Sequence, residues 1–160
     1  MYVLFDTLKD SSRLWIFQSS REFTPSEVKE IERKLQDFVE EWTRHGDDLK
    51  GSYRIVYDHF IILAVDESFA TVSGCSIDAS THLIKNLENE FQIDLLNKLN
   101  TAFRHGEHLN IVSLGDFQRY VEEGKIVPET TVFNNMVQTK SELETLWEIP
   151  ANKSWHKRYF

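Results

Sequence analysis

The sequence predicts an α+β fold with a mostly antiparallel sheet and two long helices on one face of it. Three observations support this prediction. Apolar residues recur at helical spacing over some segments, they alternate with polar residues over others, and the two kinds of segment follow each other along the chain. This mixed order excludes both a purely helical bundle and a pure β-sandwich.

The first half of the chain predicts three strands. Arg13–Gln18 is rich in aromatic and branched residues, and Tyr53, Ile55 and Tyr57 alternate with their neighbours. A tight connection at Asp58-His59 leads to the uninterrupted apolar run 60–65, which is typical of a more central strand.

Two helices are predicted between and after these strands. Thr24 and Glu27 have the spacing of a capping box around Pro25, and the helix that follows is expected to end at Gly46. The small-residue loop 73–76 leads into a second helix with one apolar stripe. The resulting β-α-β-β-α order predicts a ferredoxin-like core.

The second half predicts shorter elements. Two apolar stretches, 99–103 and 109–114, flank a turn at 104–107 and are expected to close the same sheet as a hairpin. A helix ending near Gly124, an edge strand, a helix to about Trp147 and an irregular tail are expected to follow. We therefore predict a single domain over residues 1–160, with a core at about 11–114 and a C-terminal α/β extension at about 115–160.

Composition narrows the class of protein. The 160 residues include 41% hydrophobic side chains, enough to fill a core, which argues against intrinsic disorder. The net charge of −8 argues against a general nucleic-acid or anionic-membrane binder. The longest apolar run is far shorter than the roughly 20 residues of a membrane helix, and no secretory leader precedes it. The lone Cys75 excludes an internal disulfide, so a cytoplasmic protein is expected.

A catalytic interpretation exists for the segment 66–82. Cys75 would be the nucleophile, His82 the base, and Asp78 or Asp66 the group that orients the base. However, Cys75 and His82 are seven positions apart, which is roughly 10 Å along a helix. Capping and packing roles are the structural alternative.

The same segment offers a ligand-binding interpretation. Ser73, Gly74 and Ser76 stand at the predicted start of a helix, where free amides attract anions, and Glu67 lies at the end of the preceding strand. Ser73 and Ser76 are equally ordinary helix-capping residues.

The sequence contains neither a P-loop nor a complete metal-binding motif. No glycine begins a P-loop, because none is followed at the required spacing by Gly-Lys-Ser/Thr, so a P-loop ATPase is rejected. The segment His105–His108 resembles half a metal site, but Gly106 places it in a turn, and we interpret it as a polar hairpin tip. We expect no metal and no cofactor.

The tail combines aromatic and basic residues. Lys153, Lys157 and Arg158 give residues 153–160 a charge of +3 and are interleaved with Trp155 and Tyr159. Such a tail either folds back onto the domain or docks a partner, including a nucleic-acid strand by base stacking. Outside the tail 153–158 we expect no nucleic-acid binding.

Three short motifs carry a resemblance to a known family. They are Ser73-Gly-Cys-Ser-Ile-Asp-Ala-Ser80, Val132-Phe-Asn-Asn135 and Ser154-Trp-His156. With them the chain resembles a family of small, uncharacterised bacterial proteins of similar length, which are sometimes labelled "ABC transporter ATPase". The missing P-loop contradicts that label. The resemblance implies single-domain boundaries and brings no activity or site residues.

The sequence is therefore compatible with two functions. The first is a small-ligand-binding or protein-interaction module, whose partner is a small anionic ligand or another protein, including a second copy of the chain paired through a sheet face or edge. The alternative is a small hydrolase or transferase that uses the segment 66–82.

Overall fold

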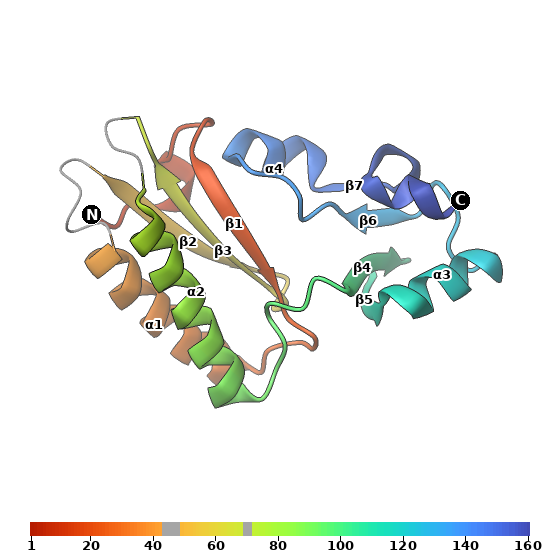
Figure 1. Cartoon of the computed structure of the whole chain (residues 1–160), viewed down its shortest axis with the longest axis horizontal. Coiled ribbons are helices and arrows are strands. Elements are labelled where there is room, and N and C mark those ends of the chain that lie inside the picture. The colour runs from red at the N-terminus through yellow and green to blue at the C-terminus, as the bar shows by residue number, and fades with distance from the viewer. Residues whose placement is uncertain (43–48, 69–71) are drawn as a thin grey trace. The chain divides into compact units, whose positions relative to one another are not determined.

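The computed structural model describes residues 1–42, 49–68 and 72–160, and within them it contains four α-helices and two antiparallel sheets (Figure 1). The predicted α+β class is confirmed. The chain forms two compact units: the first is Met1–Leu96 with Gln138–Ser141, and the second is Asn97–Val137 with Glu142–Phe160. One domain over residues 1–160 stays a prediction.

The first unit contains a three-stranded antiparallel sheet. Its elements are β1 (Arg13–Gln18), α1 (Pro25–Trp42), β2 (Lys50–Val56), β3 (Phe60–Asp66) and α2 (Gly74–Phe91). The strand order is β1-β3-β2, so the apolar strand β3 lies between the other two and every one of its residues is buried. The expected central position of this strand is confirmed.

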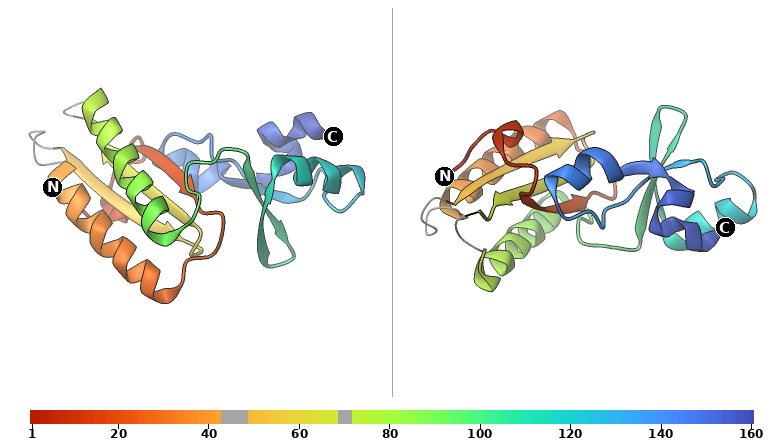
Figure 2. Two further views of the ribbon diagram at one scale, coloured as in Figure 1. Left: turned by 60° about the horizontal axis from the view of Figure 1, so that its bottom comes forward. Right: turned by 90° about the horizontal axis from the view of Figure 1, so that it is seen from above.

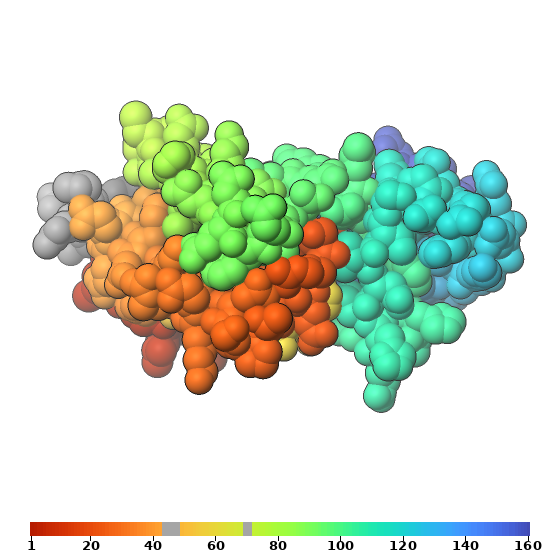
Figure 3. All heavy atoms as spheres, turned by 90° about the horizontal axis from the view of Figure 1, so that it is seen from below, coloured from red at the N-terminus to blue at the C-terminus, as the bar shows by residue number. Residues whose placement is uncertain are grey.

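Both long helices cover one face of this sheet, as the sequence predicted (Figures 1 and 3). Apolar stripes of α1 and α2 pack against every second residue of β3, because side chains of a strand alternate between its two faces. The fully buried centre of this core consists of Ile31, Leu35, Val39, Ile61, Leu63, Val65, Ile84 and Leu87.

The predicted capping box begins α1. The Glu27 amide donates to Thr24 Oγ1 over 3.2 Å, and the Thr24 amide donates to Glu27 Oε1 over 2.8 Å. The Arg21 guanidinium donates two hydrogen bonds of 2.8 Å to the Glu27 carboxylate and lowers the pKa of that carboxyl to about 2. The predicted helix end at Gly46 lies outside the described residues.

Segments from both ends of the chain complete the first unit. The guanidinium of Arg54 lies 4.2 Å from the centre of the Phe5 ring. Lys140 is buried, and its Nζ donates to the carbonyl oxygens of Asp6 and Leu8 over 3.0 and 2.8 Å. The Leu14 amide donates to the Gln138 carbonyl over 2.9 Å, so part of the β1 edge is occupied.

The second unit has a sheet of its own. It contains β4 (Asn100–His105), β5 (His108–Ser113), α3 (Leu114–Glu122), β6 (Thr131–Phe133) and β7 (Glu148–Pro150), with the strand order β5-β4-β6-β7. A further helix, α4 (Lys140–Leu146), begins in the first unit and ends in the second.

The assignment of the β4–β5 hairpin to the first sheet was wrong. The hairpin forms as predicted, but Phe103 of β4 pairs with Val132 of β6, and this pairing places the hairpin in the second sheet. Its residues therefore group with the later part of the chain rather than with a core at 11–114. The strand β7 was also not predicted.

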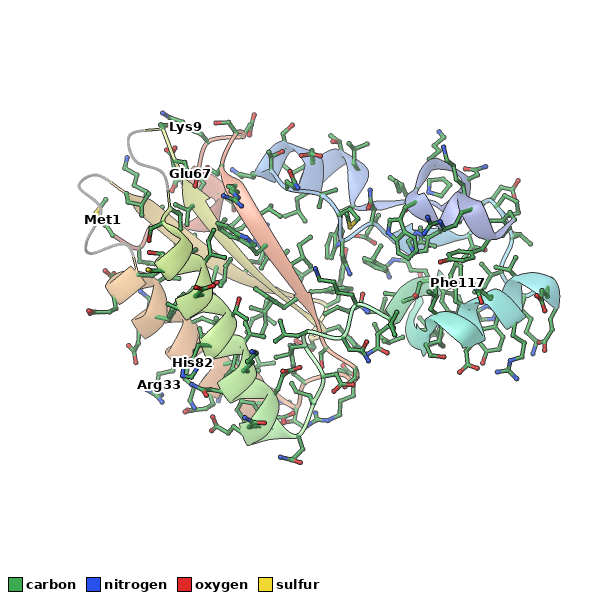
Figure 4. The ribbon with its side chains drawn as sticks, viewed as in Figure 1. Met1, Lys9, Arg33, Glu67, His82 and Phe117 are labelled. Carbon is green, nitrogen blue, oxygen red and sulfur yellow. The ribbon has the colours of Figure 1, made fainter. Side chains whose placement is uncertain are left out.

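The expected irregular tail is instead folded. Ala151–Lys153 and Trp155–Tyr159 form two short 3₁₀ helices. They pack on α3, whose Phe117 is fully buried at the centre of the second unit (Figure 4).

Candidate functional site

The carboxylates at the end of β3 are held by their own loop and by nearby cations. The Ser68 amide donates to Asp66 Oδ1 over 2.9 Å, and the Ser68 hydroxyl donates to the same oxygen. These bonds, above all that of the hydroxyl, lower the pKa of Asp66. Lys9 Nζ donates to Ser68 Oγ and lies 4.0 Å from Asp66 (Figure 4). Asp66 is thus an ionised structural carboxylate.

The neighbouring Glu67 contacts Val72, which precedes α2, and Arg13 of β1. Its Oε1 accepts from the Val72 amide over 3.0 Å and lies 3.8 Å from an Arg13 nitrogen. Because this carboxylate is already engaged by an amide and a guanidinium, it contributes to loop structure rather than to an open ligand site.

The residues at the start of α2 are helix caps. Ser73 Oγ accepts from the Ser76 amide over 3.1 Å, and the Ser76 carbonyl accepts from the Trp42 indole over 3.0 Å. A side chain built at Gly74 would meet no atom within 4 Å, so this glycine is not needed for close approach. The capping alternative is therefore the arrangement that the structure contains for Ser73, and Ser76 supplies the amide that Ser73 caps.

The three residues of the catalytic interpretation lie along one exposed helix surface. Cys75, Asp78 and His82 all belong to α2 and all are exposed. Figure 4 labels His82 on this helix. Within the described part of the chain, no hydrogen bond joins any two of them or connects them to Asp66. The seven-residue spacing of Cys75 and His82 within one helix keeps them about 10 Å apart. The structure thus does not assemble a nucleophile with its base.

The tail packs Trp155, His156 and Tyr159 within the second unit, whereas its cations are exposed. His156 is fully buried beside Phe117, at 5.4 Å between ring centres, and stacks on Trp155 at 3.8 Å. Lys153, Lys157 and Arg158 are exposed. No carboxylate of the described chain lies within ion-pairing distance of these three cations.

His156 is also electrostatically unusual. Its Nδ1 lies 2.7 Å from Ser154 Oγ, whereas its Nε2 is buried without a partner among the described residues. Burial lowers the pKa of His156 to about 4, so the ring is neutral at pH 7.

The outer edge of β5 is a candidate binding surface that was not predicted from the sequence. This strand is at the end of the second sheet, and its four central residues are half-buried. Its six residues, His108–Ser113, include no Lys, Arg, Asp, Glu or Pro. Native edge strands are commonly blunted by such residues. Figure 2 shows β4 and β5 as a twisted two-stranded ribbon.

The hydrogen-bond phase of the hairpin shows which groups of β5 face outward. The Leu114 amide donates to the Leu99 carbonyl over 2.7 Å, and paired positions alternate between bonded and non-bonded along an antiparallel ladder. Leu114, Val112 and Asn110 are therefore the bonded positions, and their backbone amides and carbonyls face β4. The intervening residues Leu109 and Ile111 direct their amides and carbonyls away from β4. Within the described residues these outward groups have no backbone partner.

Comparison with protein families, curated proteins and solved structures found no match to this chain. No helix of the described ranges has the length and apolar character needed to cross a membrane. Among the described side chains, no three of His, Cys, Asp or Glu are grouped so as to hold a metal ion.

Proposed function

We propose that this protein is an interaction module that binds an extended strand of a partner polypeptide along the outer edge of β5. The observation that carries the proposal is the pair of outward-facing residues Leu109 and Ile111, whose amides and carbonyls on that side have no backbone partner in the ranges 1–42, 49–68 and 72–160. An added strand satisfies such groups by continuing the ladder, and side-chain contacts on the two faces then give selectivity.

The other sheet edges support this choice by contrast. Part of the β1 edge is paired with Gln138 and Thr139, and the start of β2 is paired with Met1–Val3. The remainder of β2 carries Arg54, and β7 is three residues long and ends in Pro150. Each of these edges thus has a feature that disfavours pairing with another chain, whereas β5 has none of them.

A proline substitution tests the proposal because its effect depends on whether the amide that it removes faces β4 or faces outward. Ile111→Pro removes an outward amide and leaves the β4–β5 bonds intact, since proline is tolerated where the N–H faces away from the sheet. Ile111→Val is the matched control, because it keeps the amide and a branched side chain.

The measurement is a selection of displayed peptides on the wild-type chain, at a protein concentration low enough to avoid self-association. We expect peptides that bind the wild type and Ile111→Val but not Ile111→Pro, and that shift the amide resonances of Leu109 and Ile111. Peptides that bind all three proteins equally, or a selection that enriches none, would overturn the proposal.

We further infer a ferredoxin-like identity for the first unit. The element order β-α-β-β-α and the strand order β1-β3-β2 support it. The bridge between Arg13 and Thr139 lies at the β1 edge, where a fourth strand of that fold would pair.

A further inference from the structure

We infer that the strand bound along β5 is β5 of a second copy of this chain, so that two copies pair antiparallel about a two-fold axis at Asn110. This inference rests on the proposed function of the β5 edge and names its partner.

Symmetry restricts how two identical edges can pair. A two-fold axis between antiparallel strands stands perpendicular to the sheet, so it keeps each side chain on the same face. Side chains of a strand alternate between the two faces, and two residues can therefore be paired only if the sum of their numbers is even. With the axis at Asn110, Leu109 of one copy is opposite Ile111 of the other, and the reverse pair is equivalent. These are the residues whose backbone groups face outward, so both pairs become hydrogen-bonded pairs of the new ladder.

The side chains of β5 suit this register. Leu109 and Ile111 are half-buried, and each would cover the other across the new strand pair. The remaining contacts place Asn110 opposite Asn110, His108 opposite Val112, and Ser113 opposite Glu107 of the hairpin turn. No position of β5 carries a formal charge at neutral pH, so self-pairing brings no like charges together. An edge without charge also has nothing with which to select a charged foreign strand.

The other edges explain why the association stops at two copies. Pairing of β5 with a different edge of a second copy would be head-to-tail and would extend into a filament. The edges of β1 and β2 are partly occupied by other segments of the chain, and β7 is short and ends in proline. Pairing of β5 with β5 uses both open edges and gives a closed dimer with one continuous sheet.

Sedimentation equilibrium of the full chain over a range of concentrations tests the inference. We expect wild type and Ile111→Val to approach twice the 18.9 kDa of one chain, with slow exchange of the Leu109 and Ile111 amides. Ile111→Pro removes one outward amide from each copy. We expect it to raise the dimer dissociation constant by about tenfold to a hundredfold, because two neutral hydrogen bonds are lost.

The outcomes separate this inference from the proposed function. A wild-type chain that stays monomeric at every concentration overturns the second copy as partner, whereas the peptide selection decides independently whether the β5 edge binds strands. Dimers that form equally well in wild type and Ile111→Pro overturn pairing through β5. If circular dichroism shows Ile111→Pro to be unfolded, Leu109→Lys replaces it, since two lysines near the axis repel each other. A dimer unaffected by Leu109→Lys likewise overturns the inference.

Discussion

The buried imidazole of His156 predicts a loss of stability in mildly acidic solution. The ring is fully buried between Phe117 and Trp155, and its pKa is about 4, against about 6.5 for an exposed histidine. Below pH 6.5 the unfolded chain therefore binds a proton that the folded chain does not. Stability contributed by the neutral ring is complete above that pH and is lost progressively down to about pH 4.

The size of this effect follows from the two pKa values. Between pH 7 and pH 5 the free energy of unfolding should fall by about 2 kcal/mol through this one residue. Most carboxylates remain ionised at pH 5, and Glu27, with a pKa of about 2, does not titrate in this range. The interval from pH 7 to pH 5 thus isolates the histidine from acid denaturation by carboxyl groups.

The assay is urea unfolding at several pH values for wild type, His156→Phe and His82→Leu. His82 is exposed on α2, so its variant should keep the wild-type decrease. His156→Phe should be less stable at pH 7, since it loses the contact with Ser154, but should show a smaller decrease toward pH 5. An unchanged decrease in His156→Phe would contradict the role of His156, as would an NMR titration in which the His156 ring protonates near pH 6.5.

Two further variants test a buried cation and a strained turn of the first unit. Lys140→Met keeps the aliphatic stem but leaves the carbonyls of Asp6 and Leu8 without their donor, so chemical denaturation should show a loss of about 1–3 kcal/mol. The exposed control Lys29→Met should change stability by less than about 0.5 kcal/mol, and an equal effect of both would contradict the role of Lys140. Tyr57 and Asp58 join β2 to β3 with φ of 54° and 51°, a conformation that costs most side chains free energy. The double variant Tyr57→Asn, Asp58→Gly should therefore raise the stability by about 0.5–1 kcal/mol in thermal unfolding, and a lower midpoint would count against strain at this turn.

Local signals in the sequence predicted local structure well. The spacing of Thr24 and Glu27 predicted a capping box that the structure contains, and Ser73 proved to be the cap of α2. The predicted strand 13–18 is β1, and the predicted apolar strand 60–65 lies within β3. These features depend on residues a few positions apart, so that short segments contain the information that specifies them.

Features that depend on distant pairing were not predicted. The turn at Gly106 allowed the β4–β5 hairpin to be predicted. The sheet to which this hairpin belongs depends on the pairing of Phe103 with Val132, about 30 residues later in the chain. Lys140 is charged and would ordinarily be placed at the surface, yet the carbonyls of Asp6 and Leu8 compensate its burial. Likewise, no local pattern marks His156 as buried.

The open edge of β5 shows why the proposed site could not be recognised from the sequence alone. The segments 60–65 and 108–113 both lack charged residues, and this composition is typical of a strand with neighbours on both sides. For β3 that expectation holds, because β1 and β2 flank it. For β5 the same composition occurs with a neighbour on one side only. An uncharged strand at an edge is a liability for an isolated chain, and that liability is removed when a second strand pairs with it. The conflict between composition and position, visible only once the strand order is known, is what points to a partner.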